Sequence, residues 1–203
     1  WCAAGTRLLV QENIHDRFVE KLSASVAALR IGPEHGAASG PITTPGQFEK
    51  IRSFFDIAAR DGLKSVIGGR VADDPRLNGG WYIEPTVYTG VTNDMAIAQE
   101  EIFGPVLSVI AYDDVDEAIA IANDSSYGLA GTVWTNDVER GIEISTKIRT
   151  GTFGINWYAI DPESPFGGYK NSGIGRENGR EGLESFLEHK STMLPMGYEV
   201  STG

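Results

Sequence analysis

The chain reads VLSVIAY at residues 106–112 and DDVDEAIAIAN at residues 113–123. The first stretch is a continuous apolar run rich in β-branched residues and bounded by turn residues, which predicts a buried strand. In the second stretch, Asp114 is followed three residues later by Glu117, and this acidic capping box predicts a helix over 115–123. A strand that runs directly into a helix is the unit from which mostly parallel α/β sheets are built.

Apolar runs elsewhere predict further strands around this unit. Residues 7–11 and 153–157 have the composition of short buried strands. Residues 81–88 alternate aromatic and β-branched side chains around Pro85, which favours the edge of a sheet because proline cannot donate a ladder hydrogen bond. Two more strands are expected at 64–67 and 129–134.

Polar capping residues predict where the helices begin. Asn13 is expected to cap a helix whose apolar residues recur at the helical period of about 3.6 residues. Thr44 precedes Pro45, and proline suits the first helical turn because the missing amide donor is not needed there. Asn136 with Glu139 repeats the capping-box pattern and predicts another helix start.

Alternation of strands and helices predicts the fold class. We expect an α/β fold, in which a mostly parallel sheet is flanked by helices on both faces. No internal repeat, low-complexity tract or long linker divides the sequence, so residues 1–190 are expected to form one domain and residues 191–203 a short tail. The chain starts Trp1-Cys2 without an initiator methionine, and we expect that a piece of a longer protein precedes it.

The composition excludes several classes of protein. The 203 residues carry 17 Lys+Arg against 28 Asp+Glu, a net charge of −11, so neither nucleic acid nor an anionic membrane is expected as a partner. No apolar run approaches the ~20 residues of a membrane span. One cysteine and three dispersed histidines exclude a disulfide framework and predict no metal site. Because the sequence shows no signal peptide, we expect a cytoplasmic protein.

Three segments could carry chemistry, and each has a plainer alternative. Cys2 is the only thiol and sits among small residues, but a lone cysteine is more often an inert buried hydrophobe. The segment EEIFGP at 100–105 places two carboxylates before the strongest strand, where they could bind a ribose diol or form a solvated turn. The segment SPFGGYKNSG at 164–173 could equally be a tight packing loop. The glycines at 173–179 do not fit the dinucleotide fingerprint, because Asn178 stands where the third glycine belongs.

Taken together, these segments resemble the NAD(P)-dependent aldehyde dehydrogenase family. The segment CAAGTR at residues 2–7 is similar to the one that starts at the family's active-site cysteine. Residues 100–106 resemble the family's E-E-x-F-G-P-V motif, and residues 164–173 resemble its S-P-F-G-G-x-K-x-S-G loop. The motifs occur in the family's order and spacing, and the likeness implies an aldehyde dehydrogenase catalytic-domain fold for this chain.

The resemblance implies a role for each matching residue. Cys2 corresponds to the catalytic nucleophile, whose thiolate attacks an aldehyde to form a thiohemiacetal and then a thioester, with its backbone amide as one oxyanion donor. Glu101 corresponds to the carboxylate that holds the nicotinamide ribose, and Phe103 to the aromatic residue near the nicotinamide of NAD or NADP. The residues that fall where the family lines its aldehyde tunnel are Trp1, Trp157 and Phe166.

The resemblance also implies that several parts of the family's active site are missing from this sequence. Family members carry a dinucleotide-binding domain, a general-base glutamate and an oxyanion-hole asparagine ahead of the nucleophile, and none has a counterpart in this sequence. The chain alone is then expected to be nearly inactive, since a general base contributes a factor of about 10²–10⁴. The alternative is a catalytically dead folded fragment that acts only in subunit association. The tail at 191–203 resembles the segment that crosses between subunits in family dimers and tetramers, which predicts a homo-oligomer.

Overall fold

Strands and helices alternate along the chain, and the computed structural model describes residues 1–77 and 79–199. The strands are β1 (Arg7–Gln11), β2 (Ser65–Ile67), β3 (Thr86–Tyr88), β4 (Val106–Tyr112), β5 (Tyr127–Gly128), β6 (Ala130–Val133), β7 (Thr152–Ile155) and β8 (Tyr169–Lys170). The helices are α1 (His15–Ala27), α2 (Pro45–Arg60), α3 (Ala96–Gln99), α4 (Val115–Asn123), α5 (Val138–Lys147) and α6 (Gly179–Glu184), with 3₁₀ turns η1 (Glu12–Ile14) and η2 (Pro75–Leu77).

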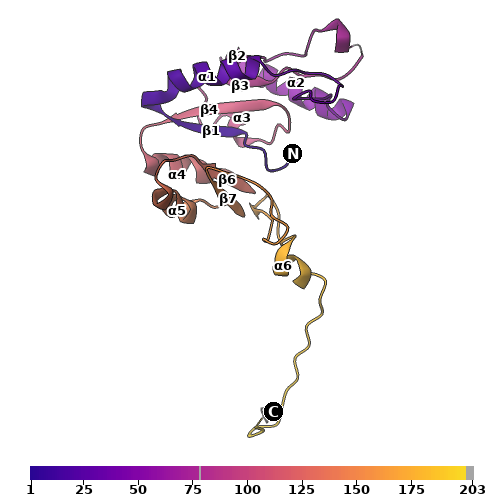
Figure 1. Ribbon diagram of the computed structural model, residues 1–203, viewed down its shortest axis with the longest axis vertical. Coiled ribbons are helices and arrows are strands. Elements are labelled where there is room, and N and C mark those ends of the chain that lie inside the picture. The colour runs from indigo at the N-terminus through magenta and orange to yellow at the C-terminus, as the bar shows by residue number, and fades with distance from the viewer. Residues whose placement is uncertain (78, 200–203) are drawn as a thin grey trace.

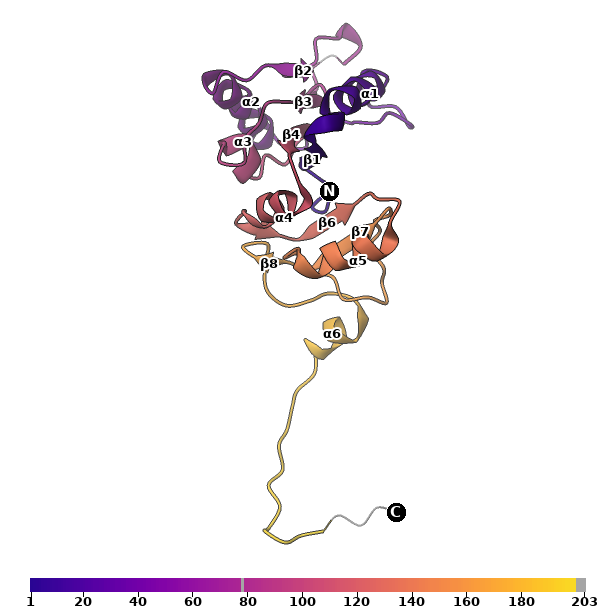
Figure 2. The same cartoon turned by 90° about the vertical axis from the view of Figure 1, so that its left-hand side faces the viewer.

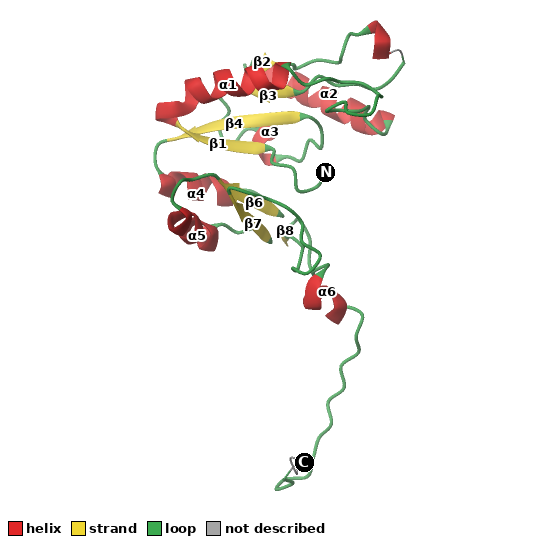
Figure 3. Ribbon diagram, in the orientation of Figure 1, coloured by secondary structure: helices red, strands yellow, loops and turns green. Residues whose placement is uncertain are grey.

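The largest sheet of the described residues has the strand order β1-β4-β3-β2 (Figures 1 and 3). β4 pairs in parallel with both β1 and β3, and only β2 is antiparallel. The prediction of an edge strand over residues 81–88 is wrong, because β3 is shorter and lies between β4 and β2. Pro85 precedes β3, so its missing amide costs no ladder bond, while the Thr86 amide donates to the Pro105 carbonyl at 2.8 Å.

Helices cover both faces of this sheet, as the alternation predicted. The side chains of β4 point to opposite faces in turn. Val106 and Ile110 pack in a core cluster with α2 and α3, whereas Val109 packs in a second cluster against α1. The α/β fold class with a mostly parallel sheet flanked by helices is therefore confirmed.

The remaining strands do not extend the four-stranded sheet. Within the described part of the chain, β6 pairs in parallel with β7, and β5 pairs antiparallel with β8. Figures 1 and 2 show β6, β7, α4 and α5 in a layer beyond β1, which is an edge strand of the four-stranded sheet. The amino terminus lies between this layer and the four-stranded sheet in both views.

Two of the predicted helix starts are confirmed. Thr44 caps α2 by accepting the Gln47 amide at 3.2 Å, with Pro45 in the first turn. Asp114 accepts the Glu117 amide at 2.9 Å, and Glu117 in return accepts the Asp113 amide at 2.7 Å. The predicted cap at Asp114 is therefore formed, while Glu117 returns its bond to the residue before the cap and not to the amide of Asp114 itself.

The other two predicted caps are wrong. Asn13 lies inside the 3₁₀ turn η1, and α1 begins after Ile14 without a side-chain cap. The cap of α5 is Asp137 and not its neighbour Asn136, because Asp137 accepts the Arg140 amide at 2.9 Å. Thr135 favours this register, since its hydroxyl accepts the Asp137 amide at 3.0 Å.

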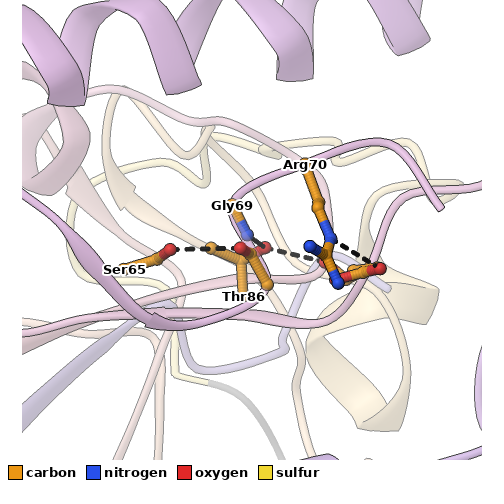
Figure 4. Close-up of polar contacts among 6 residues, drawn as sticks. Ser65, Gly69, Arg70 and Thr86 are labelled. Atoms are coloured by element: carbon orange, nitrogen blue, oxygen red, sulfur yellow. Dashed lines mark hydrogen bonds and ion pairs between the residues drawn. The ribbon is translucent and has the colours of Figure 1, made fainter. Parts of the chain in front are cut away.

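Hydrogen bonds connect the turn that follows β2 to the residues that lead into β3, beside the register shift between the two strands (Figure 4). Gly68 and Gly69 both adopt positive φ, at 71° and 77°, which a side chain would strain. The Gly69 amide donates to the Thr86 hydroxyl at 2.8 Å, and that hydroxyl donates to the Glu84 carbonyl at 2.7 Å. Arg70 pairs with the Glu84 carboxylate at 2.9 Å. The buried Thr86 hydroxyl therefore determines how the chain enters β3.

Beyond α6 the chain leaves the body of the molecule as an extended segment (Figure 1). Every side chain from 183 to 199 is exposed. Of the predicted tail at 191–203, residues 200–203 lie outside the described residues, and subunit crossing by this tail stays a prediction. None of the described helices is both long and apolar enough to cross a bilayer. The cytoplasmic location also stays a prediction.

Candidate active site

Cys2 lies in a turn just ahead of β1. The Ala4 amide donates to the Trp1 carbonyl at 3.1 Å and closes this turn, and the Cys2 side chain is exposed. The Ser108 amide of β4 then donates to the Thr6 carbonyl at 2.9 Å. The thiol is therefore accessible to a reagent or substrate, which contradicts the plainer reading of an inert buried side chain.

The segment 100–105 is held against α2 by its backbone. Gln47 of α2 donates to the carbonyls of Ile102 and Phe103 at 2.8 and 3.1 Å, and the Lys50 ammonium donates to the Glu101 carbonyl. Because the bonds use carbonyl oxygens, the side chains of Glu101 and Phe103 stay exposed. Phe103 is 43% exposed and has a φ of +57°, a strained conformation for an aromatic residue.

The Cys2 turn and the segment 100–105 lead into the four-stranded sheet at the same end of its strands. β1 and β4 are adjacent and parallel, with Arg7 opposite Ser108, so the chain enters both strands from the same end of the sheet. This is the amino-terminal end of the strands. Open α/β sheets more often bind ligands beyond the carboxyl ends, so the site departs from the position that the strand-end argument favours.

Aromatic side chains from the second layer surround an open hollow of about 350 Å³. Trp157 and Phe166 line it together with Tyr158, and they come from the segment after β7 and from the glycine-rich loop. The Trp1 ring lies 6.3 Å from the Tyr158 ring, centre to centre, at a tilt of 56°. The Tyr158 hydroxyl is in turn 2.8 Å from the Thr152 hydroxyl of β7.

The structure thus brings the predicted residues together in two groups. Trp1, Trp157 and Phe166 gather around the hollow, directly or through Tyr158. The second group shares a position along the sheet, because Cys2 precedes β1 while Glu101 and Phe103 precede the adjacent parallel strand β4. Trp1 precedes Cys2 in the chain and therefore connects the groups.

The glycine-rich loop 164–173 also has the packing function that its plainer alternative proposed. A side chain on Gly168 would meet Ser172 at 2.5 Å, and one on Gly151 would meet the Gly167 carbonyl at 1.6 Å. Phe166 is fixed by an isolated bridge in which its amide donates to the Glu177 carbonyl at 2.8 Å. The glycines let the backbone pack closely, and the bridge holds the aromatic ring at the hollow.

Some residues of this site were not assigned from the sequence. Tyr158, Ile160 and Asp161 line the hollow, and their position beside Trp157 is the signal that could have indicated them. Gln47 carries no such signal, because an exposed helical glutamine does not show which distant carbonyls it meets. No group of three or more metal-binding side chains occurs within residues 1–77 and 79–199.

The chain belongs to the aldehyde dehydrogenase family, whose sequence profile matches residues 1–192. It is 44% identical over 202 residues to the betaine aldehyde dehydrogenase of Brucella anthropi, covering 97% of this chain and 41% of the relative. The corresponding enzyme of Mesorhizobium japonicum is also 44% identical, over 201 residues, with the same coverage of 97% and 41%. The chain therefore spans about two fifths of the length of these relatives.

Solved structures agree with this assignment. An aldehyde dehydrogenase of Mycobacterium tuberculosis complexed with NAD+ superposes with a TM-score of 0.93 at 52% identity, covering 98% of this chain and 41% of that one. A betaine aldehyde dehydrogenase of Staphylococcus aureus in complex with NAD+ gives a TM-score of 0.91 at 38% identity, covering 98% and 42%. The fold described above is thus that of the matching part of aldehyde dehydrogenases.

Proposed function

We propose that this chain supplies the nucleophile and part of the substrate tunnel of an enzyme that oxidises an aldehyde to a carboxylic acid with NAD or NADP. The observation that carries the proposal is that Cys2 is exposed in a turn ahead of β1 and follows Trp1, whose ring contacts Tyr158 at the aromatic hollow. Family membership supports the same reaction. The identity of the aldehyde depends on tunnel residues of which Trp1, Trp157 and Phe166 are one part.

The proposed chemistry starts at the Cys2 sulfur. The thiolate attacks the aldehyde carbon, a C–S bond forms, and the carbonyl oxygen becomes an oxyanion. Within residues 1–77 and 79–199 no backbone hydrogen bond uses the Cys2 amide, so that amide is available to stabilise the oxyanion. When bound, NAD or NADP supplies the acceptor for the hydride that leaves the substrate carbon. Water then cleaves the thioester, which releases the acid and restores the thiol.

Glu101 and Phe103 are proposed to face the nicotinamide half of the cofactor. The Glu101 carboxylate is exposed while its backbone is held by Lys50, so it can accept hydrogen bonds from both hydroxyls of a ribose. The exposed Phe103 ring offers an apolar surface beside it. These residues fit the nicotinamide ribose of NAD or NADP, and nothing in them distinguishes the two cofactors.

The chain alone is expected to turn over slowly. Among the described residues, no histidine or carboxylate side chain forms a hydrogen bond with the exposed Cys2 sulfur. A general base contributes a factor of about 10²–10⁴. The first, acylating half of the reaction is therefore the step to measure on this chain.

Acylation of Cys2 by p-nitrophenyl acetate tests the proposal. Attack by the sulfur breaks the ester C–O bond, releases nitrophenolate and leaves an acetyl thioester on Cys2. We expect one nitrophenolate per chain in a burst, acetylation of the peptide that contains Cys2, and slower acylation when an aldehyde occupies the sulfur. Absorbance and peptide mass spectrometry measure these three outcomes.

A relocated thiol provides the matched control. The double variant Cys2→Ala/Ser25→Cys carries its only thiol on the exposed surface of α1, an element that contributes no residue to the proposed site. We expect Cys2 to react at least about tenfold faster than this control, because one hydrogen bond to a developing oxyanion contributes more than that. Equal rates, with no protection by aldehyde, would show that Cys2 is an ordinary surface thiol.

A second candidate function is subunit association without catalysis. The side chains that favour it are exposed apolar residues of the extended carboxyl-terminal segment, among them Phe186 at 87%, Met193 at 88% and Met196 at 103% exposure. Such a run of exposed apolar side chains is typical of a surface that another chain covers. A homodimer or homotetramer formed through residues 191–203 is compatible with the catalytic proposal.

A further inference from the structure

The backbone carbonyls at the carboxyl end of α4 accept hydrogen bonds from side chains that come from distant parts of the chain. The last carbonyls of a helix have no partner within the helix and carry partial negative charge. Basic residues in the last turn commonly meet them, but the last turn of α4 contains none. We call residues 121–125, at this helix end, the α4 hub.

Arg7 connects the hub to the segment that carries Cys2. Its guanidinium donates to the carbonyls of Ile121 and Ala122, both at 2.9 Å. The same group donates to the Asn93 side-chain oxygen at 2.7 Å. Arg7 opens β1, and Cys2 lies in the turn directly ahead of it. The fork of the guanidinium therefore fixes the start of β1 against the helix end.

Asn93 and Gln99 connect the hub to the segment that carries Glu101. The Asn93 amide group donates to the Asp124 carbonyl at 2.8 Å and to its carboxylate at 2.9 Å. The Gln99 amide group donates to the same carbonyl at 2.9 Å and to the Asn93 carbonyl at 2.6 Å. Gln99 is the last residue of α3, immediately ahead of the segment 100–105.

Lys170 connects the hub to the glycine-rich loop. Its ammonium donates to the carbonyls of Asn123 and Ser125 at 2.7 and 2.9 Å. Lys170 lies in β8, within the loop that places Phe166 at the hollow. Burial lowers the pKa of Lys170, and the charges of Arg149 and Arg7 lower this pKa further. The Asp124 carboxylate, itself part of the hub, raises this pKa and offsets part of the effect.

We propose that the α4 hub sets the relative positions of the three segments that carry the candidate active site, with Arg7, Gln99 and Lys170 as positioning residues. The inference rests on the proposed function of Cys2, because it assigns these residues to the geometry of that site. They touch neither substrate nor cofactor and act through α4.

Lys170→Met is the sharpest test, because Lys170 is far from Cys2 in sequence and is connected to it here through α4. We expect acylation of Cys2 by p-nitrophenyl acetate to slow by about tenfold to a hundredfold, as small displacements of a reacting group do. Lys170→Arg keeps the charge and the donors, and it should restore most of the rate. Arg7→Met should slow the reaction as Lys170→Met does, and the double variant should lose less than the product of the two losses, because both act on one element.

Lys21→Met is the matched control, since it removes an ammonium from the exposed side of α1 and should leave the rate unchanged. Circular dichroism and thermal unfolding identify variants that fail to fold. For those, Gln99→Leu keeps both cations and tests the hub through its neutral contact. A folded Lys170→Met chain whose Cys2 reacts at the wild-type rate would overturn the proposal.

Amide hydrogen exchange separates this inference from the proposed function. Lys170→Met should accelerate exchange of the hydrogen-bonded amides of the two segments, Ala4 and Glu100, which Lys170 does not contact through any hydrogen bond. If wild-type Cys2 reacts no faster than the relocated thiol, the function fails while the exchange result still decides the hub. Unchanged exchange in both segments of a folded Lys170→Met chain would refute the hub in either case.

Discussion

Thr86 shows how one buried hydroxyl can stabilise a turn that positions a strand. Thr86 is 2% exposed. Its hydroxyl accepts a hydrogen bond from the Gly69 amide and donates one to the Glu84 carbonyl (Figure 4). Thr86→Val keeps the shape and the β-branch but removes both bonds. We expect the free energy of unfolding to fall by about 1–3 kcal/mol, because a part-buried amide loses its partner. Urea denaturation measures the change.

The matched control for Thr86 is Thr146→Val on α5. Thr146 is exposed, and its hydroxyl donates to the Glu143 carbonyl at 2.7 Å, a bond that water can replace. We expect a change within about 0.5 kcal/mol for this surface position. Equal effects in the two variants would show that the Thr86 hydroxyl contributes nothing specific to the turn.

The pairing of Asp74 with Arg76 makes the stability of the fold depend on pH. Hydrogen bonds from the Arg76 side chain and backbone lower the pKa of Asp74 from 3.8 to about 2. A carboxyl with a lowered folded-state pKa stabilises the fold above the unfolded pKa, and this contribution is lost as the pH falls towards the folded value. We expect the contribution of Asp74 to disappear between about pH 4 and pH 2.

Substitution at Arg76 tests the cause of this shift. Arg76→Met removes the side-chain donors but keeps the backbone amide, so the pKa of Asp74 should rise most of the way back towards 3.8. Carboxyl-carbon NMR titration of Asp74 measures it. Arg180→Met removes an arginine from a separate surface pair with Glu184 and should leave the pKa of Asp74 where it is.

At the scale of single elements, α4 depends on its first turn as well as on its carboxyl end. Asp114 accepts the Glu117 amide in the capping box. Asp114→Ala should lower the free energy of unfolding by about 1 kcal/mol, because that amide loses its only side-chain acceptor at the helix start. Asp114→Asn retains a good capping residue and should cost clearly less. Identical unfolding midpoints for the alanine and asparagine variants would contradict the assigned cap.

Helix starts were only partly predictable from sequence. Thr44 and Asp114 cap their helices as predicted, and in each case a second signal agrees with the position, Pro45 after Thr44 and Glu117 three residues after Asp114. Asn136 has an equally good neighbour in Asp137, and the choice between them is made by the Thr135 hydroxyl, which sequence spacing does not reveal. Asn13 fails for another reason, because a 3₁₀ turn follows β1 before α1 begins.

At the scale of the whole molecule, the segments of the candidate site were predictable but their arrangement was not. The residues around Cys2, Glu101 and Phe166 are recognisable as motifs in the sequence. Their meeting depends on the parallel pairing of β1 with β4 and on the contacts of the α4 hub. Both the strand pairing and the hub contacts join residues that are far apart in the sequence, and the local sequence pattern around one partner does not indicate the other.

The extended carboxyl-terminal segment allows a prediction about the assembled molecule. Side chains 183–199 are all exposed, and within the described tail the one backbone hydrogen bond runs from the Tyr198 amide to the Pro195 carbonyl. Removing residues 191–203 should therefore change the free energy of unfolding of the monomer by no more than about 0.5 kcal/mol. The acylation rate of Cys2 should also be retained.

Self-association should respond in the opposite way. Sedimentation of the intact chain should give a mass that rises above 21.9 kDa with concentration, because exposed apolar side chains gain by being covered. The truncated chain should sediment as a monomer. Met193→Ser/Met196→Ser is the matched variant, since it keeps the length of the tail and removes two of its most exposed apolar side chains. An intact chain that stays monomeric at high concentration would rule out the tail as an interface between copies of this chain, and it would leave catalysis by Cys2 as the function to test.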